Sequence, residues 1–222
     1  RNGLQHSYNP IVGSAANGCV LHYNDNDRQM EDGDLVLIDA GCEVDCYAAD
    51  VTRTFPVNGK FSSPQREIYD VVLCAHEAAI EHIAPGLSWH EFHDAAVREI
   101  TRGLKDLGIL KGRLADLIKK EAYRPFFMHR TGHWLGMDVH DVGEYRVADQ
   151  WRMLEPGMML TVEPGIYISE QHRRVKKCYR GIGIRIEDDV LVTRDGCEVL
   201  TRALPVKAEA IEALMSEGRQ LV

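Results

Sequence analysis

The clearest strand of this sequence is Asp34-Leu35-Val36-Leu37-Ile38-Asp39-Ala40-Gly41, four apolar residues between two acidic ones, closed by a glycine. A short apolar run that ends at glycine predicts a buried β-strand. Residues 47–57 are rich in Val, Thr, Phe and Tyr and predict a second strand. Residues 41–45 between them are turn-like, so a hairpin is the simplest connection.

Outward from this hairpin, the chain is predicted to form helices and then strands again. Ser62-Ser63-Pro64 opens a helix with proline near its first position, and apolar residues recur at three- and four-residue spacing as far as Ile83. Ser88-Trp89-His90-Glu91 is a capping box for a helix that runs toward Leu107-Gly108. Further elements are expected at 113–120 (helix), 158–163 and 181–193 (strands) and from 205 onward (amphipathic helix). This order predicts an α+β fold.

Length and composition limit the function classes. The 222 residues are expected to form one domain over 1–222, and 45% hydrophobic with 27% charged residues indicates a packed soluble protein. No apolar run approaches the roughly 20 residues that span a bilayer, so no membrane partner is expected. A net charge of −8 argues against nucleic acid as the main partner. The start Arg1-Asn2-Gly3, without an initiator Met, suggests a trimmed segment.

The cysteines indicate the redox compartment. Six are present, an even number that leaves disulfides open, but a chain of this length does not need them. No CxxC pair occurs that would begin a zinc site. We therefore expect reduced, mostly buried thiols in a cytoplasmic protein. The six are Cys19, Cys42, Cys46, Cys74, Cys178 and Cys197.

Two carboxylates stand where apolar strands end. Asp39 follows four apolar residues, and Asp50 lies eleven residues later, within Ala48-Ala49-Asp50-Val51-Thr52. If the two strands pair, these side chains can lie side by side, and like charges that close require a cation or a shared proton. The alternatives, a turn-initiating Asp39 and a solvent-facing Asp50, stay open on this pattern alone.

Residues 129–143 concentrate histidine and glycine. His129, His133 and His140 fall within twelve residues, and histidine suits metal binding and proton transfer near neutral pH. A cluster of structural histidines is the alternative. Glu163 and Glu187 each follow an apolar strand residue and could singly face solvent.

Together the candidate metal ligands are four carboxylates and one imidazole from the histidine cluster. Oxygen-rich ligation of this kind suits Mn²⁺ more than a structural zinc. The four negative charges of Asp39, Asp50, Glu163 and Glu187 are balanced by two divalent cations, so two metals are more natural than one.

The motifs, taken together, resemble those of Xaa-Pro aminopeptidase (aminopeptidase P), one of the pita-bread metallopeptidases with prolidase, methionine aminopeptidase and creatinase. The resemblance covers Tyr8 to Thr201, and the segments 17–23 and 124–129 favour the bacterial aminopeptidase P branch over prolidase. The matching motifs are Leu37–Gly41, Ala49–Phe55, Gly132–Gly136, Val139–Asp141, Thr161–Gly165 and Arg185–Asp188.

The resemblance implies a curved, mostly antiparallel sheet with helices on its outer face. The family's catalytic domain begins with helices upstream of Tyr8, and most members carry a further N-terminal domain. The chain is therefore expected to lack its first helices, and the sheet near Ile11 to Val36 to be partly uncovered.

The resemblance also implies roles for individual residues. Asp39 would be the bidentate ligand of one metal, Asp50 and Glu187 would bridge two, and His133 and Glu163 would complete the second. His22, His129, His140 and Arg185 would face the substrate, with Glu163 as proton shuttle and the three histidines in the catalytic machinery. Tyr8 and Arg185 would orient ligand carboxylates. The implied cofactors are two Mn²⁺ ions, with Co²⁺ or Zn²⁺ as alternatives.

The implied reaction is metal-dependent hydrolysis of the N-terminal Xaa-Pro bond of peptides with proline at the second position. The full-length protein is expected to be a homo-oligomer. Prolidase, which cleaves only dipeptides, is the nearest alternative. A non-catalytic pita-bread binding module and a creatinase-like enzyme are less favoured, because all five ligand positions are kept.

Overall fold

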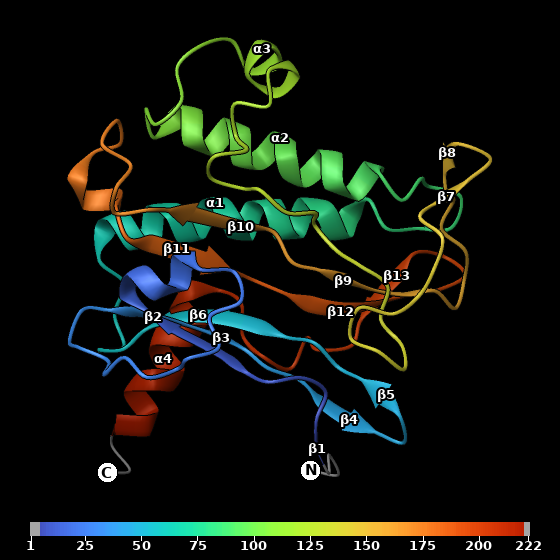
Figure 1. Ribbon diagram of the computed structural model, residues 1–222, viewed down its shortest axis with the longest axis horizontal. Coiled ribbons are helices and arrows are strands. Elements are labelled where there is room, and N and C mark those ends of the chain that lie inside the picture. Colours follow the sequence, from blue (N-terminus) through green and yellow to red (C-terminus); the bar gives the residue numbers. More distant parts are fainter. Residues whose placement is uncertain (1–4, 220–222) are drawn as a thin grey trace.

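The hairpin predicted from the first strand is the centre of the N-terminal half (Figure 1). The computed structural model describes residues 5–219. In it, β3 (Leu35–Asp39) pairs antiparallel with β6 (Thr52–Pro56) and, on its other edge, with β2 (Ile11–Ser14). Asp39 lies opposite Thr52, so the carboxylate stands at the end of the strand, as predicted.

The connection within this hairpin differs from the prediction. Residues expected to form the turn include a strand, β4 (Cys42–Val44), which pairs with β5 (Tyr47–Ala48) and with β1 (Gln5–His6). The turn falls instead at Asp45-Cys46, with φ of +51° and +63°. Two residues of positive φ form the tight turn that matches strand twist. The predicted second strand is therefore split into β5 and β6, with Asp50 in the gap.

The helices follow their predicted signals. α1 (Ser63–Glu81) begins with a capping box between Ser62 and Gln65. Before α2 (Glu91–Asp106), Ser88 N–H donates to Glu91 Oε1 at 2.8 Å, as a capping box requires, but the helix starts two residues later than that box implies, with His90 as its N-cap. α2 ends before Gly108, whose φ is +73°. The others are α3 (Leu114–Lys119) and α4 (Ala208–Arg219).

The C-terminal strands lie beneath α1 and α2 in Figure 1. β12 (Asp188–Val192) pairs with β9 (Met159–Val162) and β13 (Cys197–Val199), while β10 (Gly165–Ile168) pairs with β11 (Ile182–Arg185). The single strand expected at 181–193 is thus two strands of two ladders, separated at Ile186-Glu187. Every pairing within residues 5–219 is antiparallel. Shorter elements are β7 (Arg146–Val147), β8 (Gln150–Trp151), η1 (Ala15–Cys19) and η2 (Lys177–Tyr179).

The main core forms where α1 packs on these strands and α2 packs on α1. Burying one large apolar side chain contributes about 1.5–3 kcal/mol, so the apolar faces of both helices fix their position. The helical spacing read from the sequence is confirmed here. Buried members are Ile68, Val72, Ala75, Ala79, Phe92, Ala96, Ile100, Leu104, Leu160, Val162, Ile166, Ile184 and Val190.

The strands near Ile11 to Val36, expected to be partly uncovered, are buried at most of their positions. Ile11, Leu35 and Val36 are buried, and Leu35 belongs to the main core. Partly buried Cys19, Leu21 and Tyr23 pack against a small cluster of Ile11, Leu37 and Tyr167. Val12 and Ile38 are partly exposed.

The six cysteines are free, but the expectation that they are mostly buried is wrong. Cys42 and Cys46 lie on the β4–β5 hairpin, and Cys74 and Cys178 lie on the outer sides of α1 and η2; all four are exposed. No helix in the described part of the chain is long and apolar enough to cross a membrane.

Candidate metal centre

One cavity of about 830 Å³ brings together all five expected metal ligands. They come from the end of β3, the β5–β6 gap, the glycine-rich loop before β9, and the ends of β9 and β11. The expected substrate-facing residues line the same cavity, and Tyr8 lines an adjoining smaller one. The five are Asp39, Asp50, His133, Glu163 and Glu187, and the substrate-facing group is His22, His129, His140 and Arg185.

Asp39 and Asp50 lie side by side, as the hairpin predicted. The Tyr8 hydroxyl contacts Oδ1 of both, at 2.5 Å for Asp50. A phenol has one proton and can donate to only one carboxylate at a time. Asp39 and Asp50 are 7% and 5% exposed, so the second contact requires a proton or a cation between them.

Arg185 fixes the position of the Asp39 carboxylate. Its Nη2 donates to Asp39 Oδ2 at 2.5 Å, and Nε donates to Thr52 Oγ1 at 3.0 Å. The third contact is from Nη1 to the Tyr167 hydroxyl at 3.1 Å. Arg185 is 3% exposed, so this geometry fits an orienting role and leaves little surface for a substrate.

His133 presents one ring nitrogen to the carboxylates. Its Nδ1 lies 2.9 Å from the Trp134 carbonyl, which can only accept, so the proton belongs on Nδ1. The Nε2 lone pair then faces Asp50 Oδ2 at 3.4 Å and Glu163 Oε1 at 3.7 Å. Asp50, His133 and Glu187 offer ligand atoms within 4.8 Å of one another. A lone pair directed at carboxylates fits a cation between them.

The charges of the cluster support the same conclusion. Burial raises the pKa of Glu163 to about 7 and, together with Asp50 and Glu163, holds the pKa of Glu187 well above its usual value. Burial also raises the pKa of Asp39, against the effect of Arg185. For His133, burial opposes protonation, but the hydrogen bond to Asp50 and the charge of Glu163 raise its pKa overall. Without a cation, the cluster therefore retains protons. The residues present fit divalent metal ions.

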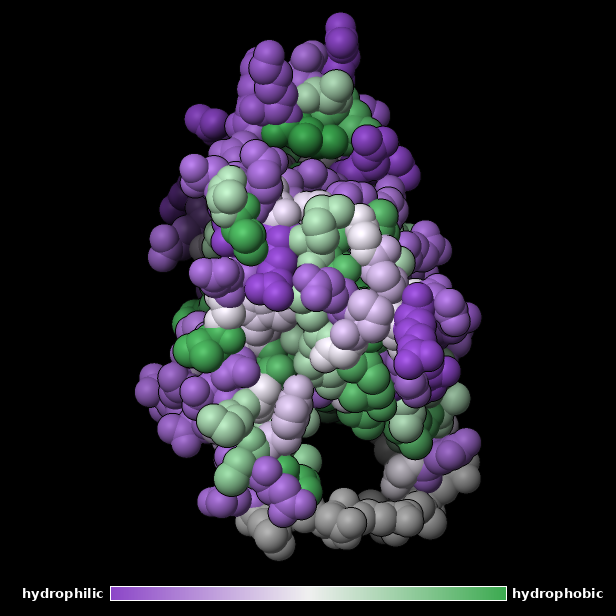
Figure 2. All heavy atoms as spheres, turned by 90° about the vertical axis from the view of Figure 1, so that its right-hand side faces the viewer, coloured by the Kyte–Doolittle hydropathy of each residue, from purple (hydrophilic) through white to green (hydrophobic). Residues whose placement is uncertain are grey.

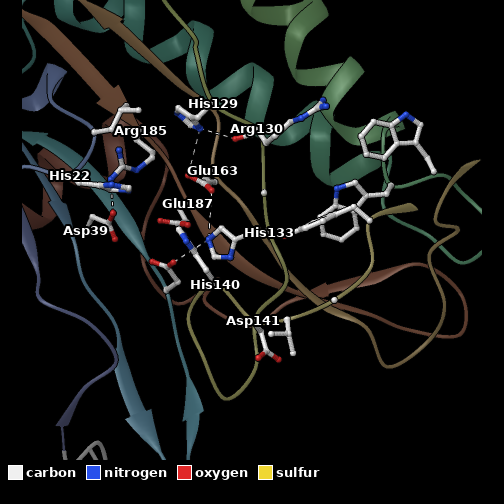
Figure 3. Close-up of a pocket in the computed structure, with 18 residues that line it drawn as sticks. His22, Asp39, His129, Arg130, His133, His140, Asp141, Glu163, Arg185 and Glu187 are labelled. Carbon is white, nitrogen blue, oxygen red and sulfur yellow. Dashed lines mark hydrogen bonds and ion pairs between the residues drawn. The ribbon is translucent and has the colours of Figure 1, made fainter. Parts of the chain in front are cut away.

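The three other histidines differ in how freely they face the cavity (Figure 3). Both ring nitrogens of His129 have partners: Nδ1 lies 2.7 Å from the Arg130 carbonyl, and Nε2 lies 2.9 Å from the Tyr167 hydroxyl. His140 packs edge-on against His133, with ring centroids 4.2 Å apart. Burial lowers the pKa of His129 to about 4 and also lowers that of His140. Both rings are therefore neutral near pH 7. His22 is exposed at the cavity wall.

Sequence reasoning missed two residues that support this centre. Tyr167 is 2% exposed and links His129 to Arg185 through its hydroxyl. A tyrosine within the apolar strand Gly165–Ile168 must find a partner for that hydroxyl, and this was the available signal. Asp189 Oδ2 accepts the Asp50 N–H at 3.2 Å. Its signal was a second acidic residue at the start of an apolar strand.

Comparisons with known proteins place this arrangement in a family. The model of metallopeptidase family M24 matches residues 1–194, and the chain belongs to that family. Among curated proteins, it is 58% identical to the Xaa-Pro aminopeptidase of Haemophilus influenzae over 210 residues, covering 95% of this chain and 48% of that protein. It is 57% identical to the Xaa-Pro aminopeptidase of Escherichia coli over 221 residues, covering 99% of this chain and 50% of that protein.

Comparison with solved structures supports the same family. The aminopeptidase PepP of Pseudomonas aeruginosa superposes with a TM-score of 0.97 at 59% identity, over 98% of this chain and 49% of that one. The resemblance to aminopeptidase P and the expected pita-bread fold are thereby confirmed. The chain spans about half the length of the relatives it matches. One E. coli aminopeptidase P structure contains substrate, and another contains the inhibitor Pro-Leu.

Proposed function

We propose that the protein is a dinuclear, metal-dependent Xaa-Pro aminopeptidase that releases the residue before proline. The observation that carries this proposal is the convergence of five expected ligands in one cavity, beside three histidines. The similarity to Xaa-Pro aminopeptidases of two bacteria supports the reaction type. A cytoplasmic location and a homo-oligomeric state of the full-length protein stay predictions.

The proposed metal set is two Mn²⁺ ions, with Co²⁺ and Zn²⁺ as alternatives. Asp39 would hold one ion, His133 and Glu163 the other, and Asp50 and Glu187 both. Carboxylate-rich ligation favours Mn²⁺, and the four negative charges match two divalent ions. When bound, such ions activate water as a nucleophile and polarise the carbonyl of the bond that is cleaved.

Proton transfer is assigned to Glu163. Glu163 lines the cavity beside the other expected ligands, where a carboxylate can accept a proton from a bound nucleophile and return it. In this proposal Glu163 takes the proton from the nucleophile and passes it to the proline nitrogen as that nitrogen leaves.

His140 is assigned to the developing oxyanion. Its neutral ring can donate an N–H toward charge that forms during the reaction. His129 is already engaged by Arg130 and Tyr167, so we assign it to the wall that the substrate contacts. His22, which is exposed at the cavity wall, would contact the substrate there.

The selectivity for proline has two physical sources. An imide nitrogen carries no N–H, so a site that never requires this donor accepts proline. The cavity is also lined by the aromatic rings of Trp89, Tyr145 and Trp151, which offer flat apolar surface to a pyrrolidine ring.

The test is metal analysis of the full natural chain together with a peptide assay. We expect two metals per chain and turnover of Xaa-Pro-Yaa tripeptides, with little turnover of Xaa-Ala-Yaa and loss of turnover on chelation. Turnover of Xaa-Pro dipeptides alone would indicate prolidase instead. No turnover of either peptide with Mn²⁺, Co²⁺ or Zn²⁺ would contradict the proposal.

A further inference from the structure

An indole with two guanidinium groups lies at the rim of the cavity. The Arg130 Cζ lies 5.1 Å from the ring centroid of Trp151, and the Arg146 Cζ lies 4.3 Å from it. The His90 ring stacks on the same indole at 4.7 Å, with an interplanar angle of 4°. Contacts between cations and an aromatic face position the guanidinium groups without neutralising their charge.

Neither guanidinium has an acidic partner. Among residues 5–219, no carboxylate oxygen lies within 4.0 Å of Arg130 or Arg146. Two other arginines do have acidic partners: Arg124 pairs with Glu121, and Arg152 pairs with Glu155. The polar neighbour of Arg130 is His90 Nδ1 at 3.4 Å, a group without negative charge. Two positive charges at this rim are thus left unneutralised.

One of these two charges, that of Arg130, lies at the cavity that holds the carboxylates. Arg130 and Trp151 line that cavity, and Arg146 joins them in the wall of an adjoining one of about 510 Å³. In Figure 3 the Arg130 side chain extends away from Glu163, so its charge lies apart from the carboxylate cluster. Figure 2 views the side that carries β7 and β8, where hydrophilic residues lie among apolar ones. The carboxylates and the Arg130 guanidinium therefore occupy different parts of one cavity, and Arg146 lies in the adjoining one.

We propose that Arg130 and Arg146, held on Trp151, form a subsite for a carboxylate of the peptide substrate beyond its proline. This inference rests on the proposed function. Cleavage before proline leaves only one residue on the amino-terminal side of the bond, so the rest of the peptide must leave the centre toward the rim. A short peptide ends there in its C-terminal carboxylate, and a longer one can present an Asp or Glu side chain. A planar guanidinium binds either group through paired N–H donors.

The experiment compares free-acid and C-terminally amidated Xaa-Pro-Yaa peptides on the full natural, metal-loaded chain. For the unaltered protein we expect amidation to raise KM about tenfold, as the loss of one charge-assisted hydrogen bond does, with little change in kcat. In Arg130→Gln and Arg146→Gln the ratio of the two KM values should fall toward one. Arg113→Gln, which alters an arginine that is 83% exposed on its side chain and outside both cavities, should behave like the unaltered protein.

A second pair of substrates separates the two sources of the carboxylate. Longer amidated peptides with Glu or Gln after the proline-containing pair test for a side-chain carboxylate, whereas the tripeptides test for the C-terminus. Selectivity in either pair that both arginine variants lose supports the subsite. An unchanged ratio in the Arg130→Gln, Arg146→Gln double variant would overturn it.

Failure of the proposed function gives a different result. If the unaltered protein hydrolyses no amide or acid substrate, the peptidase proposal fails. The subsite is then measured by calorimetric binding of Pro-Yaa dipeptide acid against its amide. Tighter binding of the acid that the double variant loses still supports the subsite, and equal binding of both contradicts it.

Discussion

Glu187 and Asp188 are neighbours in sequence, each 2% exposed, but their environments are opposite. Asp188 Oδ1 pairs with Arg53 Nη2 at 2.7 Å, and Oδ2 lies 3.0 Å from His76 Nε2. Burial would raise the pKa of Asp188, but His76 and Arg53 lower it overall. The pKa of Glu187 is raised well above its usual value by burial and by neighbouring carboxylates.

The difference follows from their geometry at the start of a strand. Consecutive side chains point to opposite faces, so Asp188 is directed at α1 and Glu187 at the cavity. The chain supplies Asp188 with a guanidinium, that of Arg53, and with the imidazole of His76, from two distant segments. For Glu187 the nearest partner is a hydroxyl, Thr52 Oγ1 at 2.6 Å. A buried carboxylate that its own chain neutralises is structural, and one left without a cation is suited to an external cation.

The strongest test of this contrast is Asp50→Asn on the cavity side. Asparagine offers one neutral carbonyl oxygen, and its NH₂ group cannot bind a metal. We expect loss of at least one metal and a fall in Xaa-Pro-Yaa turnover of more than about 100-fold, since even residues that only support ligands cost 10–100-fold. Asp45→Asn, in the exposed turn, is the control. Near-normal turnover in both variants would contradict the assignment.

A second test compares the two neighbours directly by denaturant unfolding of metal-free protein. Asp188→Asn leaves Arg53 buried without its carboxylate and should cost about 3–5 kcal/mol of unfolding free energy. In metal-free protein the raised pKa of Glu187 keeps this carboxyl protonated, so Glu187→Gln replaces one neutral group with another. Its unfolding free energy should change by less than about 1 kcal/mol while metal binding is lost. The opposite order of the two effects would show that Asp188 is not the structural member of the pair.

The smallest expected effect is a dependence of metal-free stability on pH. The pKa of Glu163 is raised in the folded state from 4.5 to about 7, so the folded protein binds more protons than the unfolded chain between these values. This contribution is complete below about pH 4.5 and is lost as the pH rises through 7, on the order of 1–3 kcal/mol. Unfolding free energies at pH 5.5 and 8, with chelator, should show the decrease, and added metal should remove it. A rise in metal-free stability over this range would contradict the assignment for Glu163.

The sequence was sufficient for the parts of the fold set by local pattern. The apolar run that ends at Asp39 gave the first hairpin, and the capping residues before α1 gave a helix start. The resemblance then gave the ligand positions that line the cavity. Residues whose role depends on distant partners could not be predicted. His76 lies on α1, and nothing in its helix indicates that it faces Asp188.

The centre joins segments that are far apart in the chain, so its residues are synthesised at different times. Thr52 and Glu187, in contact at the centre, are 135 residues apart in the chain, and Asp39 and Arg185 are 146 apart. At synthesis rates of about 5–20 residues per second, Glu187 follows Thr52 from the ribosome by on the order of 10 s. During this interval Asp39 and Asp50 exist without the groups that complete the centre. Metal loading of the proposed ligand set would therefore follow synthesis of β11 and β12.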